Sequence, residues 1–274
     1  MNHIKKFIVL LFLLTSMGLQ AQDFSPETYW QDVNFNDTTL ISSKLLSDKM
    51  IDFLYQYSCC DEETFDSLTI SSIGIILEKA KTNMKVYEYA IGFLLNGYNN
   101  MGKSQVVDYL LTYPMLFEGE ISMEDGLRLD SITEPYQKVR VGAQAPDFTG
   151  VTIDGKSYRL YNSKAKNIIV VFWSTDCEYC HDFLKDIRKH LDLKSDYELV
   201  TFALADSQEE VTEAAKDLRL HGYHFYDPMR WESKPFLDYH VTSTPTVFLL
   251  DNEKNIVCKP YDWLELKLYI KENK

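Results

Sequence analysis

The sequence predicts an all-helical region followed by an α/β region in which helices flank a mixed central sheet. Apolar residues recur at helical spacing as far as Pro114, whereas β-branched runs alternate with helical patterns after Val139. Residues 22–138 carry 8 Lys and Arg against 19 Asp and Glu, a net charge of −11, while residues 139–274 carry 18 against 22, a net of −4. We therefore divide the 274-residue chain into residues 1–21, 22–138 and 139–274.

The first 21 residues are typical of a secretory signal peptide. Lys5 and Lys6 precede the apolar run FIVLLFLL, and a short stretch of small and polar residues ends at Ala21. The run is far shorter than the ~20 residues that span a bilayer. We expect cleavage near Ala21, no stable membrane insertion, and export to the periplasm, where disulfides persist. The exported chain would carry a net charge of −15, which disfavours nucleic acid as a partner.

Residues 22–138 are predicted to form a small helical bundle of unknown role. Short links rich in Gly and Asn favour antiparallel neighbours. The region contains no histidine, and its carboxylates are scattered, so the pattern indicates no chemistry there. The adjacent Cys59 and Cys60 could bond only through a strained ring, and we expect two unpaired thiols at a helix end. The expected helices carry the apolar residues of 42–57, 65–77, 84–98 and 106–111.

Residues 139–274 alternate between strand and helix patterns. The continuous apolar run KNIIVVF, residues 166–172, predicts a central strand buried on both faces. A helical pattern through Phe183 and Leu191 begins shortly after it. The other expected strands are 198–204, 223–227, 246–250 and 255–259, and the other helices are 208–220 and one from Trp263.

The hexapeptide DCEYCH, Asp176 to His181, permits two interpretations. C-x-x-C is a redox dithiol motif, and C-x-x-C-H is also the attachment signature of a c-type haem, with His181 as its ligand. The motif lies where the buried strand ends and a helix begins. Free N–H groups and the helix dipole stabilise a thiolate there, so the position favours the redox dithiol. Cys177 would then be exposed at the turn, with Cys180 shielded one turn further in.

Three segments in order resemble one protein group. They are GAQAPDF at 142–148, VVFWSTDCEYC at 170–180 and LDYHVTSTPTVFLLD at 237–251. Over residues 139–274 the chain resembles the TlpA/ResA group of thioredoxin-fold proteins, within the wider thioredoxin and AhpC/TSA superfamily. The whole chain also resembles Bacteroidetes proteins that place a helical domain of unknown role before a thioredoxin-like domain.

The resemblance implies a thiol–disulfide oxidoreductase with Cys177 as the attacking thiolate and Cys180 as the resolving cysteine. It also implies a cis Pro245 facing the dithiol, with Thr244 available to pair with a substrate chain. Expected partners are protein disulfides and a membrane-bound thiol electron donor; no metal and no bound cofactor are expected beyond the Cys177–Cys180 disulfide. The group suggests a reductase, although the direction depends on the reduction potential relative to the compartment.

The chain departs from the group around the dithiol. Asp176 replaces the usual tryptophan, Tyr179 a frequent proline, and Phe183 a glutamate that helps to move protons in close relatives. We expect Asp176, at or next to the helix N-cap, together with Glu178 to raise the pKa of the Cys177 thiol and to favour a reductant. Trp173, Tyr179 and Phe248 are expected to form an apolar platform around the dithiol. Alternatively, Trp173 and Phe248 belong to the core.

Two further alternatives come from other functional classes. A peroxidase of the AhpC/TSA kind needs P-x-x-x-T-x-x-C, but Thr175 lies only two residues before Cys177 and no proline stands upstream. A binding module acting through its helical domain would not need the C-x-x-C dithiol that this chain keeps. Cys258 has no partner at motif spacing, and we expect a core thiol.

Overall fold

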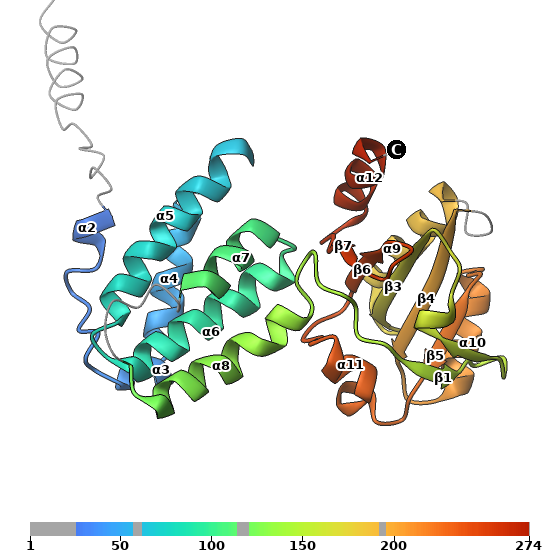
Figure 1. Cartoon of the computed structure of the whole chain (residues 1–274), viewed down its shortest axis with the longest axis horizontal. Helices are drawn as coiled ribbons and strands as arrows, with labels where there is room; N and C mark the ends of the chain where they lie inside the picture. The colour runs from blue at the N-terminus through green and yellow to red at the C-terminus, as the bar shows by residue number, and fades with distance from the viewer. Residues whose placement is uncertain (1–25, 57–61, 114–120, 192–195, 274) are drawn as a thin grey trace, which may run out of the picture.

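The computed structural model describes residues 26–56, 62–113, 121–191 and 196–273. The signal-peptide prediction and the prediction for Cys59 and Cys60 lie outside these ranges. Helices make up the described chain as far as Lys138, and the first strand begins at Thr149. We call residues 26–138 the helical part and residues 139–273 the α/β part; Figure 1 shows them side by side. The domain division after residue 138 stays a prediction.

The helical part packs around one apolar cluster that reaches from Trp30 to Tyr136. The four predicted helices are confirmed as α4 to α7, and each presents its apolar stripe to this cluster. Two short helices precede them, and one long helix follows. The helices are α2 (Pro26–Tyr29), α3 (Thr39–Ser42), α4 (Leu45–Tyr55), α5 (Glu62–Ala80), α6 (Met84–Asn100), α7 (Ser104–Thr112) and α8 (Met123–Lys138).

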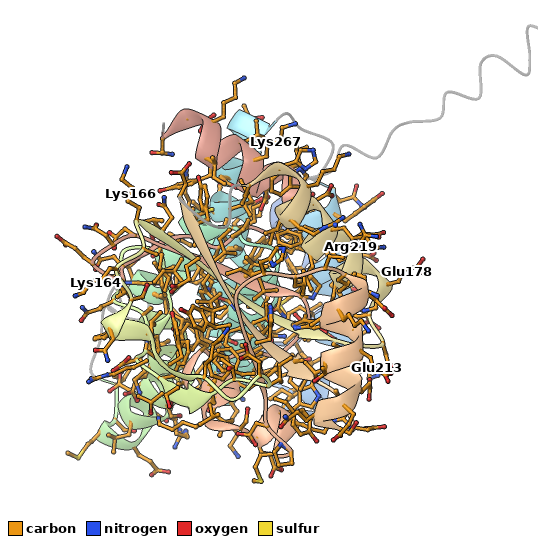
Figure 2. All side chains as sticks on the ribbon, turned by 90° about the vertical axis from the view of Figure 1, so that its right-hand side faces the viewer. Lys164, Lys166, Glu178, Glu213, Arg219 and Lys267 are labelled. Atoms are coloured by element: carbon orange, nitrogen blue, oxygen red, sulfur yellow. A yellow bond between two sulfur atoms is a disulfide. The ribbon has the colours of Figure 1, made fainter. Side chains whose placement is uncertain are left out.

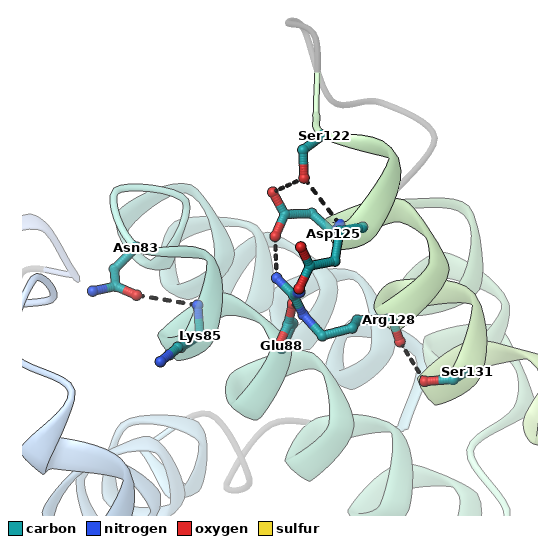
Figure 3. Close-up of polar contacts among 8 residues, drawn as sticks. Asn83, Lys85, Glu88, Ser122, Asp125, Arg128 and Ser131 are labelled. Atoms are coloured by element: carbon teal, nitrogen blue, oxygen red, sulfur yellow. Dashed lines mark hydrogen bonds and ion pairs between the residues drawn. The ribbon is translucent and has the colours of Figure 1, made fainter.

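Helix α8 was not predicted, because its sequence is polar and contains Gly126 and Pro135. Its stability comes from its neighbours rather than from propensity. Ser122 caps its first turn by accepting a hydrogen bond from the backbone N–H of Asp125 at 3.1 Å. The Arg128 guanidinium donates to Glu88 of α6 at 2.7 Å and also pairs with Asp125, as Figure 3 shows. This network joins α8 to α6 along the surface of the bundle.

A five-stranded mixed sheet forms the centre of the α/β part, in the order β5-β4-β3-β6-β7. Strands β3, β4 and β5 are parallel, and β6 runs antiparallel to β3. Six consecutive residues of β3, from Ile168 to Trp173, are buried, which confirms the predicted central strand. The strands are β1 (Thr149–Val151), β2 (Ser157–Arg159), β3 (Asn167–Ser174), β4 (Tyr197–Leu204), β5 (Tyr223–Tyr226), β6 (Thr246–Leu250) and β7 (Ile256–Cys258).

Helices cover both faces of this sheet, so alternate residues of β3 enter two separate clusters. Helices α9, α10 and α12 pack on the face that carries Ile169, Val171 and Trp173. Helix α11 and the β1–β2 hairpin pack on the other face (Figure 1). The remaining elements are η2 (Leu160–Asn162), α9 (Glu178–His190), α10 (Gln208–Asp217), η3 (Arg230–Glu232), α11 (Lys234–Asp238) and α12 (Trp263–Glu272).

Candidate active site

Cys177 and Cys180 lie at the junction between β3 and α9. They are joined by a disulfide with Cα atoms 5.2 Å apart. Cys177 is half-buried, whereas Cys180 is fully buried behind it among the apolar residues under α9. An incoming sulfur atom can therefore reach Cys177 but not Cys180. This asymmetry is what an attacking and a resolving cysteine require.

The N-cap of α9 is Cys177 itself. Its sulfur accepts a hydrogen bond from the backbone N–H of Cys180 at 3.1 Å, in the place where Ser or Asp usually caps a helix. Of the two positions expected for Asp176, the N-cap is therefore excluded, and the residue stands next to it. The N–H of Cys180 consequently faces the sulfur rather than a carboxylate. A backbone N–H donor at a helix start is the kind of group that stabilises a thiolate.

The acidic residues of the motif face solvent. Asp176 and Glu178 are both exposed, and Figure 2 shows Glu178 at the outer edge of the molecule. Lys164 and Lys166 lie at the opposite edge of that view. The charges beside the dithiol are thus negative and surrounded by water, which weakens their action on a neighbouring thiol.

Pro245 lies at the same end of the sheet as the dithiol. The Thr244–Pro245 peptide bond is cis. Thr246, the next residue, pairs with Phe172 in the β3–β6 register, and the chain beyond Phe172 continues into the dithiol turn. Thr244 and Pro245 are half-buried, so a chain bound beside Cys177 could reach their backbone. We call residues 242–245 the cis-proline loop.

The expected aromatic platform exists only in part. Trp173 is fully buried and Phe248 is 1% exposed, so both belong to the core, the second of the two roles expected for them. Tyr179 is 48% exposed between the two cysteines, and its ring centroid lies 6.5 Å from that of Tyr261. Burial, followed by the negative charges of Asp262 and Glu265, raises the pKa of Tyr179, so its hydroxyl keeps its proton.

Thr175 and Glu210 form a contact that was not expected from the sequence. The Thr175 hydroxyl bonds the Glu210 carboxylate, whose other oxygen accepts the N–H of Asp206 at 3.0 Å. Ser207 caps α10 by accepting the N–H of Glu210 at 3.2 Å. The spacing S-x-x-E before a helix is a capping-box signal that could have revealed this glutamate. The contact ties the dithiol turn to the start of α10.

Other candidate residues lie beside the site or away from it. Phe183 is 3% exposed in the core, so α9 offers no carboxylate at the position where close relatives place one. His181 is half-buried, with its ring centroid 5.8 Å from that of Trp173. Cys258 is a free, half-buried thiol, and burial raises its pKa to about 12. Within the described ranges, no three His, Cys, Asp or Glu side chains gather as metal ligands would.

A dithiol at the start of a helix and a cis-proline at the same end of a mixed sheet define a thioredoxin-like protein. The AhpC/TSA family model matches residues 141–259. The chain is 30% identical over 138 residues to "Thioredoxin-like protein YneN" of Bacillus subtilis, which covers 46% of this chain and 76% of that protein. The chain belongs to the thioredoxin-like AhpC/TSA family.

Two further comparisons bear on the activity and on the helical part. "Thiol-disulfide oxidoreductase ResA" of Bacillus cereus is 26% identical over 125 residues, covering 45% of this chain and 70% of that protein. A solved structure of a thioredoxin-like protein from Bacteroides caccae superposes with a TM-score of 0.61 at 17% identity, covering 89% of this chain and 90% of the other. Because residues 139–274 are only half of this chain, that superposition includes most of the helical part.

Proposed function

We propose that this protein is an exported thiol–disulfide oxidoreductase that reduces disulfides in protein substrates. The observation that carries the proposal is the Cys177–Cys180 pair at the first turn of α9, with only Cys177 reachable from outside. The printed name of the ResA relative supports the reaction class. The reaction needs no metal and no bound cofactor, because the two sulfur atoms carry both electrons.

The proposed reaction has two steps of thiol–disulfide exchange. The Cys177 thiolate attacks one sulfur of a substrate disulfide, so a mixed disulfide forms and the other substrate sulfur leaves as a thiolate that takes up a proton. Cys180 then loses its proton and attacks the Cys177 sulfur, which releases the second substrate thiolate. Two electrons pass from the dithiol to the substrate, and the Cys177–Cys180 disulfide is the oxidised product.

The surroundings of the dithiol give each step a physical basis. The N–H of Cys180 already points at the Cys177 sulfur and lowers the energy of a negative charge there. The cis-proline loop offers the Thr244 backbone to an extended substrate segment, and Tyr179, exposed between the two cysteines, offers an apolar surface. A membrane-bound thiol donor would return the dithiol to its reduced state.

Export is the second part of the proposal, and it rests on residues 1–21. Among the described residues, no helix has both the length and the apolar character that crossing a bilayer requires. Cell fractionation of the tagged protein should recover it from the periplasm with residues 1–21 removed. Recovery of the uncleaved chain from the cytoplasm would contradict this part alone.

The activity is tested by reduction of insulin with dithiothreitol as the electron source. The chain from residue 22 onward should accelerate precipitation of the insulin B chain, and Cys177→Ser should return the rate to background. Two thiols should become alkylatable only after reduction. A haem absorption band in protein made together with haem-attachment machinery would support the c-type haem interpretation instead.

A further inference from the structure

The last turn of α6 contacts the cis-proline loop. Thr242 Oγ1 lies 3.1 Å from Oδ1 of Asn96 and 3.1 Å from Oδ1 of Asn100. Asn96 and Asn100 are one helical turn apart, so their side chains project from the same face of α6. Thr242 precedes Pro245 by three residues. Side chains of the helical part thus hold one end of the loop that faces the dithiol.

A buried lysine just after β7 contacts the same turn of α6. Lys259 is 9% exposed, and its ammonium donates a hydrogen bond to Oδ1 of Asn99. The ammonium also lies 5.2 Å from the ring centroid of Phe248, three residues after Pro245. Burial lowers the pKa of Lys259 to about 8. Because burying an ammonium is costly, this contact indicates a built joint between the parts rather than a loose surface contact.

Gly102, just after α6, brings the two backbones close together. Its φ is +67°, and a Cβ at this position would lie 2.6 Å from the carbonyl oxygen of Lys259 and 3.2 Å from the N of Tyr261. Only glycine permits this approach. Tyr261 in turn lies beside Tyr179, the exposed residue between the cysteines. One short stretch, residues 96–102, therefore borders both the cis-proline loop and the segment that reaches the dithiol.

We propose that Asn96 and Asn100 are positioning residues for the redox reaction. They hold Thr242, so the helical part fixes the position of the cis-proline loop. That loop is one wall of the groove that binds a polypeptide disulfide. This inference rests on the proposed function. An extended substrate segment needs the loop backbone in place before its sulfur meets Cys177. A small disulfide needs only access to Cys177. The contact should therefore favour polypeptide substrates over small disulfides.

The matched pair Thr242→Val and Thr242→Ser tests this inference in the chain from residue 22 onward. Valine keeps the shape but removes the hydroxyl, whereas serine keeps the hydroxyl. Thr242→Val should raise KM for insulin about three- to tenfold, the range expected for one lost hydrogen bond, with kcat nearly unchanged. Its rate with the small disulfide dithiobis(nitrobenzoate) and its reduction potential should stay at wild-type values. Thr242→Ser should match the wild type throughout.

The double variant Asn96→Ala/Asn100→Ala approaches the contact from the helical part. It should raise KM as Thr242→Val does, and adding Thr242→Val should have no further effect. The control is Asn252→Ala, because Asn252 is exposed and lies in the turn at the far end of β6. This variant should leave KM for insulin unchanged. Additive effects, or equal losses in the valine and serine variants, would overturn the inference. So would an unchanged KM in both Thr242→Val and the double variant.

Failure of the inference is distinguishable from failure of the proposed function. A wild-type chain that reduces neither insulin nor the small disulfide would refute the oxidoreductase proposal itself. A wild-type chain that reduces both, with variants that behave alike on both substrates, would refute only the positioning role of Asn96 and Asn100.

Discussion

The helical part and the α/β part bury their apolar residues in different ways. In the helical part, amphipathic helices pack around one shared cluster. Helix α6 is covered on most sides, and only Lys85, Asn96 and Gly97 of its residues are exposed. In the α/β part, helices cover the sheet on both faces, and the sheet separates two clusters. A turn at the end of β3 is therefore held by packing on both sides of the strand before it.

This difference explains where the chemistry lies. The β3–α9 turn and the cis-proline loop both lie at one end of a rigid sheet, and this arrangement places reactive sulfur atoms reproducibly. The described residues of the helical part contain no sheet that could hold reactive groups in this way. The helical part contacts the α/β part through the last turn of α6, by Asn96, Asn99 and Asn100. On the inference above, the helical part supports the chemistry without taking part in it.

Substitution of the two motif cysteines should have the largest effect. It tests whether all the chemistry is in the α/β part. Cys177→Ser should abolish insulin reduction, because the reachable sulfur of the dithiol is lost. Cys180→Ser should accumulate mixed disulfides with partner proteins, seen as bands that disappear on reduction, because nothing resolves them. If Cys177→Ser were the better trap, the roles of attacker and resolver would be reversed.

The next largest effect should come from a substitution at the contact between the two parts. Gly102→Ala places a Cβ 2.6 Å from the Lys259 carbonyl oxygen and should lower the free energy of unfolding. The matched control is Gly155→Ala, since Gly155 also has a positive φ, of +82°, but a Cβ added there would meet no described atom within 4 Å. Gly102→Ala should cost about 1–3 kcal/mol more than the control in urea unfolding, the usual cost of overpacking. Equal losses would show that the two backbones can move apart freely.

A third effect is a pH dependence located at the joint. The pKa of Lys259 is lowered to about 8 in the folded protein, whereas an unfolded lysine titrates near 10.4. Between these values the unfolded chain binds more protons, so the stability should rise with pH. From pH 7 to pH 9 the wild type should gain on the order of 1 kcal/mol relative to Lys259→Met in urea unfolding. The comparison with Lys259→Met is needed because the raised pKa of Cys258 lowers the stability over the same pH range in both proteins. Equal pH dependence in the two proteins would assign it to groups other than Lys259.

The smallest expected effect concerns Asp176. Asp176→Asn should lower the pKa of the Cys177 thiol and make the reduction potential less negative, because a nearby like charge disfavours the thiolate. Since Asp176 is exposed and Cys177 caps α9 itself, we expect this effect to be smaller than the three above. The measurement is a thiolate absorbance titration at low and high salt, with Glu178→Gln as the comparison. Coincident titration curves at low salt would show that Asp176 has no influence.

Local pattern predicted much of the fold. The run KNIIVVF, residues 166–172, is predicted to form a buried central strand because its apolar residues follow one another without alternation. Helices α4 to α7 followed from apolar residues at helical spacing. Helix α8 escaped prediction, because its polar sequence depends on contacts with its neighbours, such as the ion pair between Arg128 and Glu88 of α6. Where a segment is stabilised by distant side chains, its own sequence carries too little signal.

At the candidate site, the sequence by itself determined the reactive residue types and their spacing, C-x-x-C after a buried strand. Residues within one helical turn of each other are close in space because the covalent chain holds them there. Only the tertiary structure decided which residues surround them. It placed Trp173 in the core, made the Cys177 sulfur the helix cap, and joined Thr175 to Glu210. It also brought Asn96 to Thr242, 146 residues away. Such contacts depend on how whole elements pack, and no local pattern encodes the meeting of two distant surfaces.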